Sequence, residues 1–193
     1  MAQPLPILLV GDDPAQTTGL ARIIRDLATL LASMPEFRVA TLGTGGTGSA
    51  TLPWPQYHMS YGEFGELSLP AVWDEWSRET QGIVMTCWDA TRCVWLAQPG
   101  TCELEVTRTW LERRRRSGEP GSFDLWGYFP FDATGPGGRL TTLVHEVLLG
   151  YHRILVPSPW AEGIVRATLG EEESKRRGVG WIPHALGRTW RAH

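Results

Sequence analysis

The sequence predicts an α/β fold, in which a doubly wound, mostly parallel sheet of six or seven strands carries helices on both faces. Three observations lead to this prediction. Short apolar runs alternate along the chain with segments whose apolar residues recur at helical spacing. The 193 residues fit a single domain, since domains commonly hold roughly 100 to 200 residues. Hydrophobic residues make up 42% and charged residues 20%, a globular composition that excludes a disordered or collagen-like chain.

The first half of the chain predicts strand–helix–strand units. Residues 7–10 are apolar and end at a loop that begins with Gly11, so we expect a buried strand. Residues 19–33 carry apolar side chains at helical spacing, with Thr17 or Thr18 as the N-cap. Such crossovers are nearly always right-handed and join parallel strands. The units continue with strands at 37–42, 57–60 and 83–88 and a helix at 69–78.

The second half continues the alternation. A helix begins near Glu103 and ends in the cationic run 113–116, which we expect to be a solvated helix end. The charged stretch 171–177 is expected to be a surface loop. In such a sheet ligands bind beyond the carboxyl ends of the strands, so the residues that follow each strand are the candidate site. The remaining expected strands are 125–129, 154–157 and 180–183, with helices at 140–149 and 160–169.

Composition also narrows the location and the partners of the protein. The net charge of −3 supplies no overall field that would attract nucleic acid. Residues 1–13 hold no basic leader and no apolar run of the roughly 20 residues that a membrane span needs. Cys87, Cys93 and Cys102 lack the short paired spacing of a zinc site, so we assign no metal and expect reduced thiols. We therefore expect a cytoplasmic protein with no nucleic-acid partner and no membrane span.

The loop after the first strand, GDDPAQTTG, excludes two common nucleotide-binding classes. It lacks the G-x-G-x-x-G of dinucleotide-binding proteins and the G-K-S/T of P-loops. Thr17, Thr18 and Gly19 stand at a helix N-terminus, where backbone N–H groups favour an anion or a sugar hydroxyl, but an ordinary cap and tight turn explains them equally well. Asp12 and Asp13 are either acceptor-binding carboxylates or turn formers.

A second group of candidates follows later strands. Trp88 and Asp89 suit a carbohydrate, because the ring can cover an apolar sugar face while the acid accepts hydroxyl protons, and Arg92 follows within a turn. The alternative is a core Trp beside an N-cap Asp. Asp132 follows the strand that Pro130 ends and is a site residue or a turn residue. If Asp89 and Asp132 faced each other at a suitable separation, they could be the acid and base of a glycoside hydrolase.

The histidines are weaker signals. His184 follows the last expected strand, a position from which an imidazole can hydrogen-bond a phosphate. His145 lies within an expected helix and His152 just before a strand, so we expect both to be structural.

Several segments, taken in order, resemble family 4 glycosyltransferases of the GT-B fold, especially phage and prokaryotic members. The resemblance covers most of the chain, and its most specific part is YFPFDA followed by VPSPW at this separation. The segments are TTGLARIIRDLATLL, CWDATR, LWGYFPFDA, RILVPSPWAEGIVRATLG and GWIPHAL.

The resemblance implies that residues 1–193 form one Rossmann-like domain, the N-terminal, acceptor-side half of a GT-B enzyme. Such an enzyme transfers a sugar from a nucleotide-sugar donor to a glycan or other acceptor with retention of configuration, and no cofactor or metal is implied. The implied catalytic positions are Asp89, Asp132 and His184. The implied substrate-binding positions are Thr17, Thr18, Gly19, Trp88, Arg92, Tyr128, Ser158 and Trp160.

Two departures from the family pattern leave a second hypothesis open. Family members usually continue after the IPH segment with Gly, a small apolar residue and Asp, whereas this sequence reads Ala185-Leu186-Gly187. The donor-binding C-terminal domain of the family does not follow within the sequence, so we expect it from a longer product or a partner chain. The alternative is a non-catalytic carbohydrate- or nucleotide-binding module, or a truncated gene product.

Overall fold

The computed structural model describes residues 3–46, 51–60 and 62–183. Within them, seven strands form one sheet in the order β3-β2-β1-β4-β5-β6-β7, and every neighbouring pair is parallel. This parallel sheet, flanked by helices, confirms the predicted Rossmann-like, doubly wound α/β fold. The strands are β1 (Leu5–Asp12), β2 (Phe37–Thr44), β3 (Gln56–His58), β4 (Gly82–Cys87), β5 (Phe123–Tyr128), β6 (Arg153–Val156) and β7 (Gly180–Trp181).

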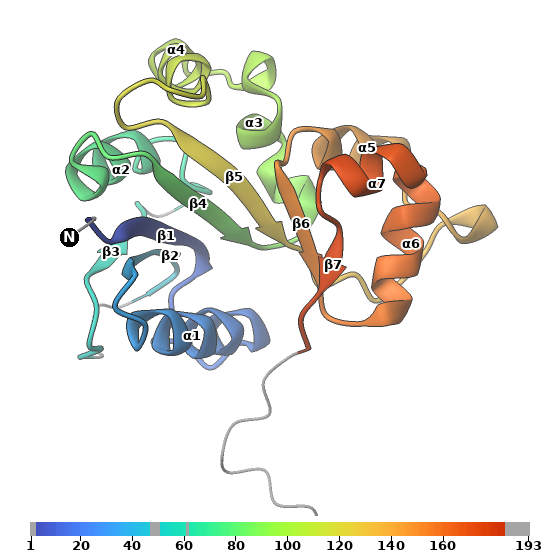
Figure 1. The fold of residues 1–193 in the computed structure, drawn as a ribbon, viewed down its shortest axis with the longest axis horizontal. Coiled ribbons are helices and arrows are strands. Elements are labelled where there is room, and N and C mark those ends of the chain that lie inside the picture. The colour runs from blue at the N-terminus through green and yellow to red at the C-terminus, as the bar shows by residue number, and fades with distance from the viewer. Residues whose placement is uncertain (1–2, 47–50, 61, 184–193) are drawn as a thin grey trace, which may run out of the picture.

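Helices lie on both faces of the sheet (Figure 1). α1 (Gly19–Ala32) covers one face, where Ile24 and Ala28 belong to the same apolar cluster as Leu9 of β1 and Val39 of β2. The helices of the opposite face are α2 (Leu69–Ser77), α3 (Val94–Ala97), α4 (Glu105–Arg114), α5 (Thr142–Leu149) and α6 (Pro159–Leu169), and α7 (Glu171–Arg176) follows α6. Short 3-10 turns are η1 (Ala90–Cys93), η2 (Pro99–Thr101) and η3 (Pro136–Gly138).

Tryptophan supplies much of the core on the α2 side. Trp73 of α2 is fully buried and meets Phe123 of β5 edge to face, with ring centroids 5.3 Å apart. Its indole N–H donates to the carbonyl of Gly121 at 2.7 Å, so the polar end of this large ring is satisfied. Burying such a side chain stabilises the fold by about 1.5 to 3 kcal/mol.

One local expectation is wrong, and another holds only in part. Residues 171–176 form the helix α7 rather than a surface loop, because three glutamates in its first turn and Lys175 and Arg176 in its last turn match the helix dipole. The run 113–116 is not simply a solvated helix end. Arg115 is half-buried and donates to the carbonyls of Leu96, Ala97 and Gly150, and burial lowers the pKa of its guanidinium.

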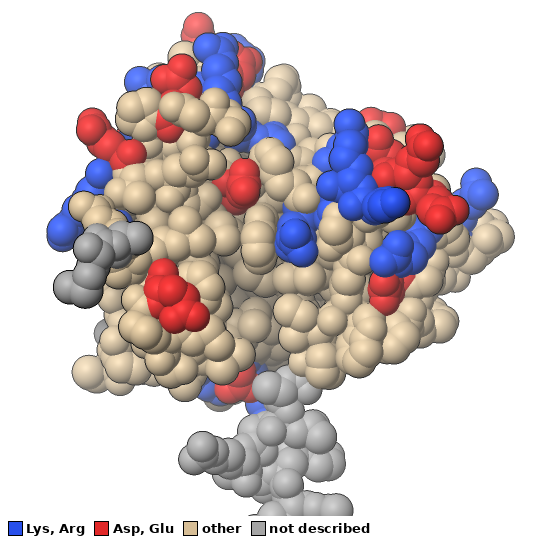
Figure 2. Space-filling view, viewed as in Figure 1, with Lys and Arg blue, Asp and Glu red and all other residues tan. Residues whose placement is uncertain are grey.

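The face that carries α1 is hollowed beyond that helix. An apolar hollow of about 620 Å³ lies between Leu27 and Leu31 of α1, Met85 of β4, Trp126 of β5 and Ile182. Figure 2 shows mostly uncharged side chains across the lower middle of the molecule, and charged ones mainly around its upper and outer parts. Among the residues described, no helix is both long enough and apolar enough to cross a membrane.

Candidate functional site

The parallel sheet brings the ends of its strands to one edge. β1 is flanked by β2 on one side and by β4 on the other, so the chain order reverses beside β1. In open α/β sheets, ligands bind in the crevice that opens at such a reversal, outside the carboxyl ends of the strands. Asp12 ends β1 and Trp88 directly follows β4, which places both at this crevice.

Asp12 gathers three of the predicted site residues around its carboxylate. Thr18 Oγ1 donates to Oδ2 at 2.7 Å, and Trp88 Nε1 donates to Oδ1 at 3.1 Å. Arg92 Nη1 lies 4.0 Å from Oδ1, and both this guanidinium and the carboxylate reach solvent. We call Asp12, Thr18, Trp88 and Arg92 the Asp12 cluster. It joins an acceptor and a cation, the two kinds of group that orient hydroxyls and stabilise negative charge.

The N-terminus of α1 forms one wall of this edge. Thr18 is the N-cap, since its Oγ1 accepts from Ala21 N at 3.1 Å, which confirms the capping alternative. Gly19 opens to solvent, because a Cβ built there would meet nothing within 4 Å. A hollow of about 320 Å³ lies between this helix end, including Thr17, and Gly45 and Gly46 of the loop after β2.

Trp88 has a different role from the one expected. Its side chain is 1% exposed, so its ring offers no face to a sugar and instead fixes Asp12 through the indole N–H. Phe64 covers it edge to face, with ring centroids 5.7 Å apart. Phe64 is the partly exposed ring at this place, and the Arg92 guanidinium lies 5.2 Å from its centroid.

Asp89 and Asp132 are both exposed after their strands. The Asp89 side chain makes no capping hydrogen bond, although it precedes η1, while its carbonyl accepts from Arg92 N at 3.0 Å. Asp89 therefore shapes the turn that presents Arg92, and its carboxylate stays open to solvent. Asp132 lies beyond β5, after Phe131. The catalytic role of either acid stays a prediction.

The remaining predicted residues are spread over the β5–β6 side of the edge. Tyr128 is buried, its hydroxyl donates to Ile182 O at 3.3 Å, and burial raises its pKa well above the usual value. Ser158 caps α6 by accepting from Ala161 N at 3.2 Å. Trp160 is 54% exposed in the first turn of α6. His184 lies outside the described residues.

One pair at this edge was missed. Asp13 is 1% exposed, and its Oδ2 lies 2.7 Å from Nδ1 of the half-exposed His58, the last residue of β3. Ala15 N donates to Oδ1 of the same carboxylate at 2.8 Å. Gly46 permits the loop to pass over it, since a Cβ there would come 1.8 Å from Oδ2. The rule that selects residues following a strand passed over His58, because the expected strand 57–60 contains it whereas β3 ends at it.

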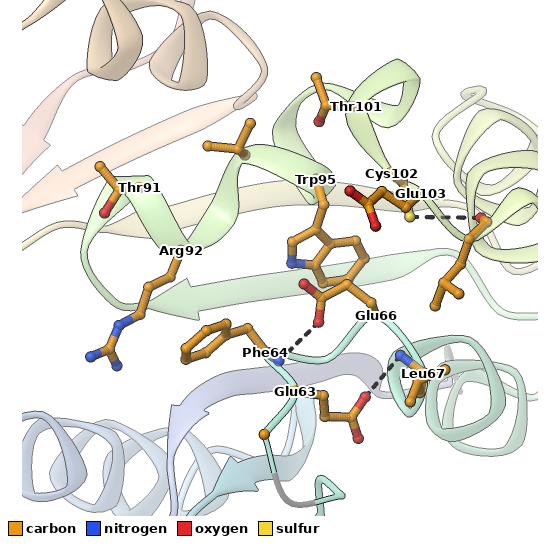
Figure 3. Close-up of a pocket in the computed structure, with 13 residues that line it drawn as sticks. Glu63, Phe64, Glu66, Leu67, Thr91, Arg92, Trp95, Thr101, Cys102 and Glu103 are labelled. Atoms are coloured by element: carbon orange, nitrogen blue, oxygen red, sulfur yellow. Dashed lines mark hydrogen bonds between the residues drawn. The ribbon is translucent and has the colours of Figure 1, made fainter.

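Another hollow begins at Arg92 of the Asp12 cluster and extends toward Leu67 and Leu104. Its volume is about 570 Å³, and it lies between the segment 62–67 and the segment 91–104 (Figure 3). Phe64 and Arg92 stand at one end, Trp95 in the middle and Leu67 at the other side. Sequence patterns could not find this hollow, because it is built from irregular loops without periodicity.

The thiols of Cys87 and Cys93 are buried and unreactive. Burial raises the pKa of Cys93 to about 11 and that of Cys87 further, so both are protonated at neutral pH. In the described part of the chain, no group of three or more His, Cys, Asp and Glu residues could hold a metal ion. The described groups placed to bind a ligand at this edge include Asp12, Arg92 and the backbone N–H groups of the α1 N-terminus.

A scan against models of known protein families finds no match, and a search of curated proteins finds no relative.

Proposed function

We propose that this domain holds the acceptor in the transfer of a sugar from a nucleotide-sugar donor to a glycan or other acceptor, with retention of configuration. The Asp12 cluster at the strand reversal carries the proposal. The ordered likeness of five segments to family 4 glycosyltransferases supports it. The loop after β1 lacks the dinucleotide-binding and P-loop fingerprints, so these two nucleotide-binding classes are not supported.

In this proposal Asp12 accepts a hydrogen bond from the acceptor hydroxyl. Thr18 and Trp88 hold the carboxylate in one position, so it need not reorganise when the acceptor binds. The bond from the sugar carbon to the donor phosphate oxygen breaks, with its electron pair leaving on the diphosphate, as the bond to the acceptor oxygen forms, and positive charge develops on the sugar. The proton of the acceptor hydroxyl passes to the oxygen of the departing diphosphate. Arg92 and the backbone N–H groups of the α1 N-terminus are placed to attract the departing diphosphate.

The donor requires more cationic groups than this edge supplies. A diphosphate is usually bound by several basic side chains or by a metal, and Arg92 with the end of α1 forms one wall only. We propose that a further domain or a partner chain provides the other wall. A closed cleft would also exclude water, which strengthens each of these contacts.

The second candidate is a non-catalytic carbohydrate-binding module. It is favoured by the fixed geometry of Asp12, because a carboxylate held by two donors is a preformed acceptor for hydroxyl groups without needing to move a proton. In this reading Phe64, rather than Trp88, would cover the apolar face of a sugar.

An array of glycans separates these candidates. The labelled protein, together with the further domain or partner chain that supplies the second wall, is applied to the array, which is then incubated with radiolabelled UDP-glucose, UDP-N-acetylglucosamine and GDP-mannose. Binding with incorporation of label at the bound glycans supports the transferase, and binding without incorporation supports the module. Glycan binding by the wild type that does not exceed binding by Asp12→Asn contradicts both candidates.

A further inference from the structure

We infer that the hollow between segments 62–67 and 91–104, here the aglycone groove, binds an apolar group of the acceptor. This group is either uncharged or cationic. This inference deepens the proposed function and rests on it. It names the class of acceptor: a small molecule whose hydroxyl or sugar reaches Asp12 while an aromatic or aliphatic portion lies in the groove.

The walls of the groove fit an apolar group. Phe64, Leu67 and Leu104 are large hydrophobic side chains that remain partly exposed, and Leu67 is 60% exposed. Exposed apolar residues scattered singly need no explanation, but here three line one hollow together with Val94 and Trp95. The volume of about 570 Å³ lies within the range of about 300 to 1,000 Å³ that small-molecule sites occupy.

Trp95 supplies an unused hydrogen-bond donor. Its side chain is 7% exposed, and its indole N–H has no hydrogen-bond partner within the described residues. Figure 3 shows the nitrogen on the side of the ring that faces Phe64 and Arg92. Buried donors are nearly always paired, so an oxygen of a bound ligand would complete this site.

The charges of the groove favour one sign of ligand. Glu66 and Glu103 line it, whereas Arg92 at the end next to the Asp12 cluster is the cation among its lining residues. Glu63 also lines it, and its carboxylate accepts from Ser60 N, Leu67 N and Ser68 N, which favours its charged form. An anionic aglycone would meet like charge along most of the groove, so a neutral or cationic one is expected.

The groove is continuous with the proposed sugar site. Arg92 and Phe64 belong to both, since Arg92 approaches Asp12 and Phe64 covers Trp88. Gly65, at φ +104, lets the loop pass over Trp95, where a Cβ would lie 3.3 Å from the ring. One ligand can therefore contact Asp12 and the groove at once.

The test follows the indole N–H signals of the protein by ¹H–¹⁵N NMR, with Trp95→Phe assigning the Trp95 signal. The probes are methyl β-D-glucopyranoside, phenyl β-D-glucopyranoside, benzyl alcohol and benzoate. We expect the phenyl glucoside and benzyl alcohol to move the Trp95 signal, and the phenyl glucoside to bind about tenfold more tightly than the methyl glucoside. Benzoate should bind more weakly than benzyl alcohol.

Matched variants sharpen the outcome. Leu67→Gln, at an exposed position in the groove, should lower the affinity for the phenyl glucoside about fivefold. Leu30→Gln, at an exposed position on α1, should leave this affinity unchanged. Equal binding of the phenyl and methyl glucosides, or a Trp95 signal that no aromatic probe moves, overturns the groove. If aromatic probes bind in the groove while Asp12→Asn leaves the phenyl glucoside unaffected, the groove is upheld and the proposed sugar site fails.

Discussion

Asp12 organises the candidate site at the scale of single residues. Sequence reasoning named Thr18, Trp88 and Arg92 separately, and left Asp12 as either a ligand or a turn former. Their meeting could not be predicted, because it depends on side-chain directions at the ends of β1 and β4. The burial of Trp88 was equally hidden, since Phe64, which covers it, lies in a loop without periodicity.

His152 gives the protein a pH dependence that can be tested. Burial lowers its pKa from the usual 6.5, and its Nδ1 accepts from Leu125 N at 2.8 Å, which requires that nitrogen to be unprotonated. The unfolded chain therefore binds this proton at higher pH than the folded chain. Stability contributed here is present above about pH 6.5 and falls as the pH drops through 6.5 toward the folded pKa.

His152→Asn keeps an acceptor for Leu125 N and removes the titration. Between pH 7.5 and 5.5, the Tm of the wild type should therefore fall further than that of the variant, as measured by thermal unfolding. Identical dependence of Tm on pH in the two proteins would contradict the claim that protonation of His152 destabilises the fold.

At the scale of elements, the caps define a second test. Ser158 was predicted to bind substrate, and it caps α6. Ser158→Ala should lower the free energy of unfolding by about 1 kcal/mol and leave glycan binding unchanged. Thr141→Ala, at the cap of α5, serves as the matched control with a similar loss of stability. If Ser158→Ala weakens glycan binding and Thr141→Ala does not, Ser158 takes part in binding the glycan.

Long amphipathic or apolar elements were predictable, and short polar ones were not. The spacing of apolar residues predicted α1 and the buried strand β4 nearly to their ends. α7 was missed because EEESKR has no apolar stripe, and its stability depends on charges at its ends and on Glu173 with Arg176 and Arg177. η1, α3 and η2, between β4 and α4, were missed because segments of three or four residues are too short to show a periodicity.

At the scale of the whole molecule, close packing makes two glycines respond oppositely. A Cβ on Gly82 of β4 would lie 2.3 Å from the carbonyl of Pro6, so Gly82→Ala should destabilise by about 1 to 3 kcal/mol. A Cβ on Gly163 of α6 would meet nothing within 4 Å, so Gly163→Ala should stabilise by about 0.5 to 1 kcal/mol. Denaturant unfolding measures both, and a neutral Gly82→Ala would contradict the packing of β4 on β1.

The strand order determines which strand ends are neighbours at the site, and the sequence does not predict this order. Alternating elements predict a parallel sheet and hence the edge that binds ligands, but not which strand ends become neighbours. β3 lies beside β2, and this placement creates the pair of Asp13 and His58 from residues 45 positions apart. Such pairs appear only when the topology is known.

The most direct test of the account is the affinity for the best glycan from the array, measured by calorimetry for wild type, Asp12→Asn and Asp26→Asn. Asp12→Asn keeps the size of the side chain and removes its charge, so binding should weaken about tenfold, or about 1.4 kcal/mol, with little change in Tm. Asp26→Asn, which removes an exposed ion pair with Arg22 on α1, should bind like the wild type. Wild-type affinity in Asp12→Asn would contradict the claim that the Asp12 cluster holds the acceptor.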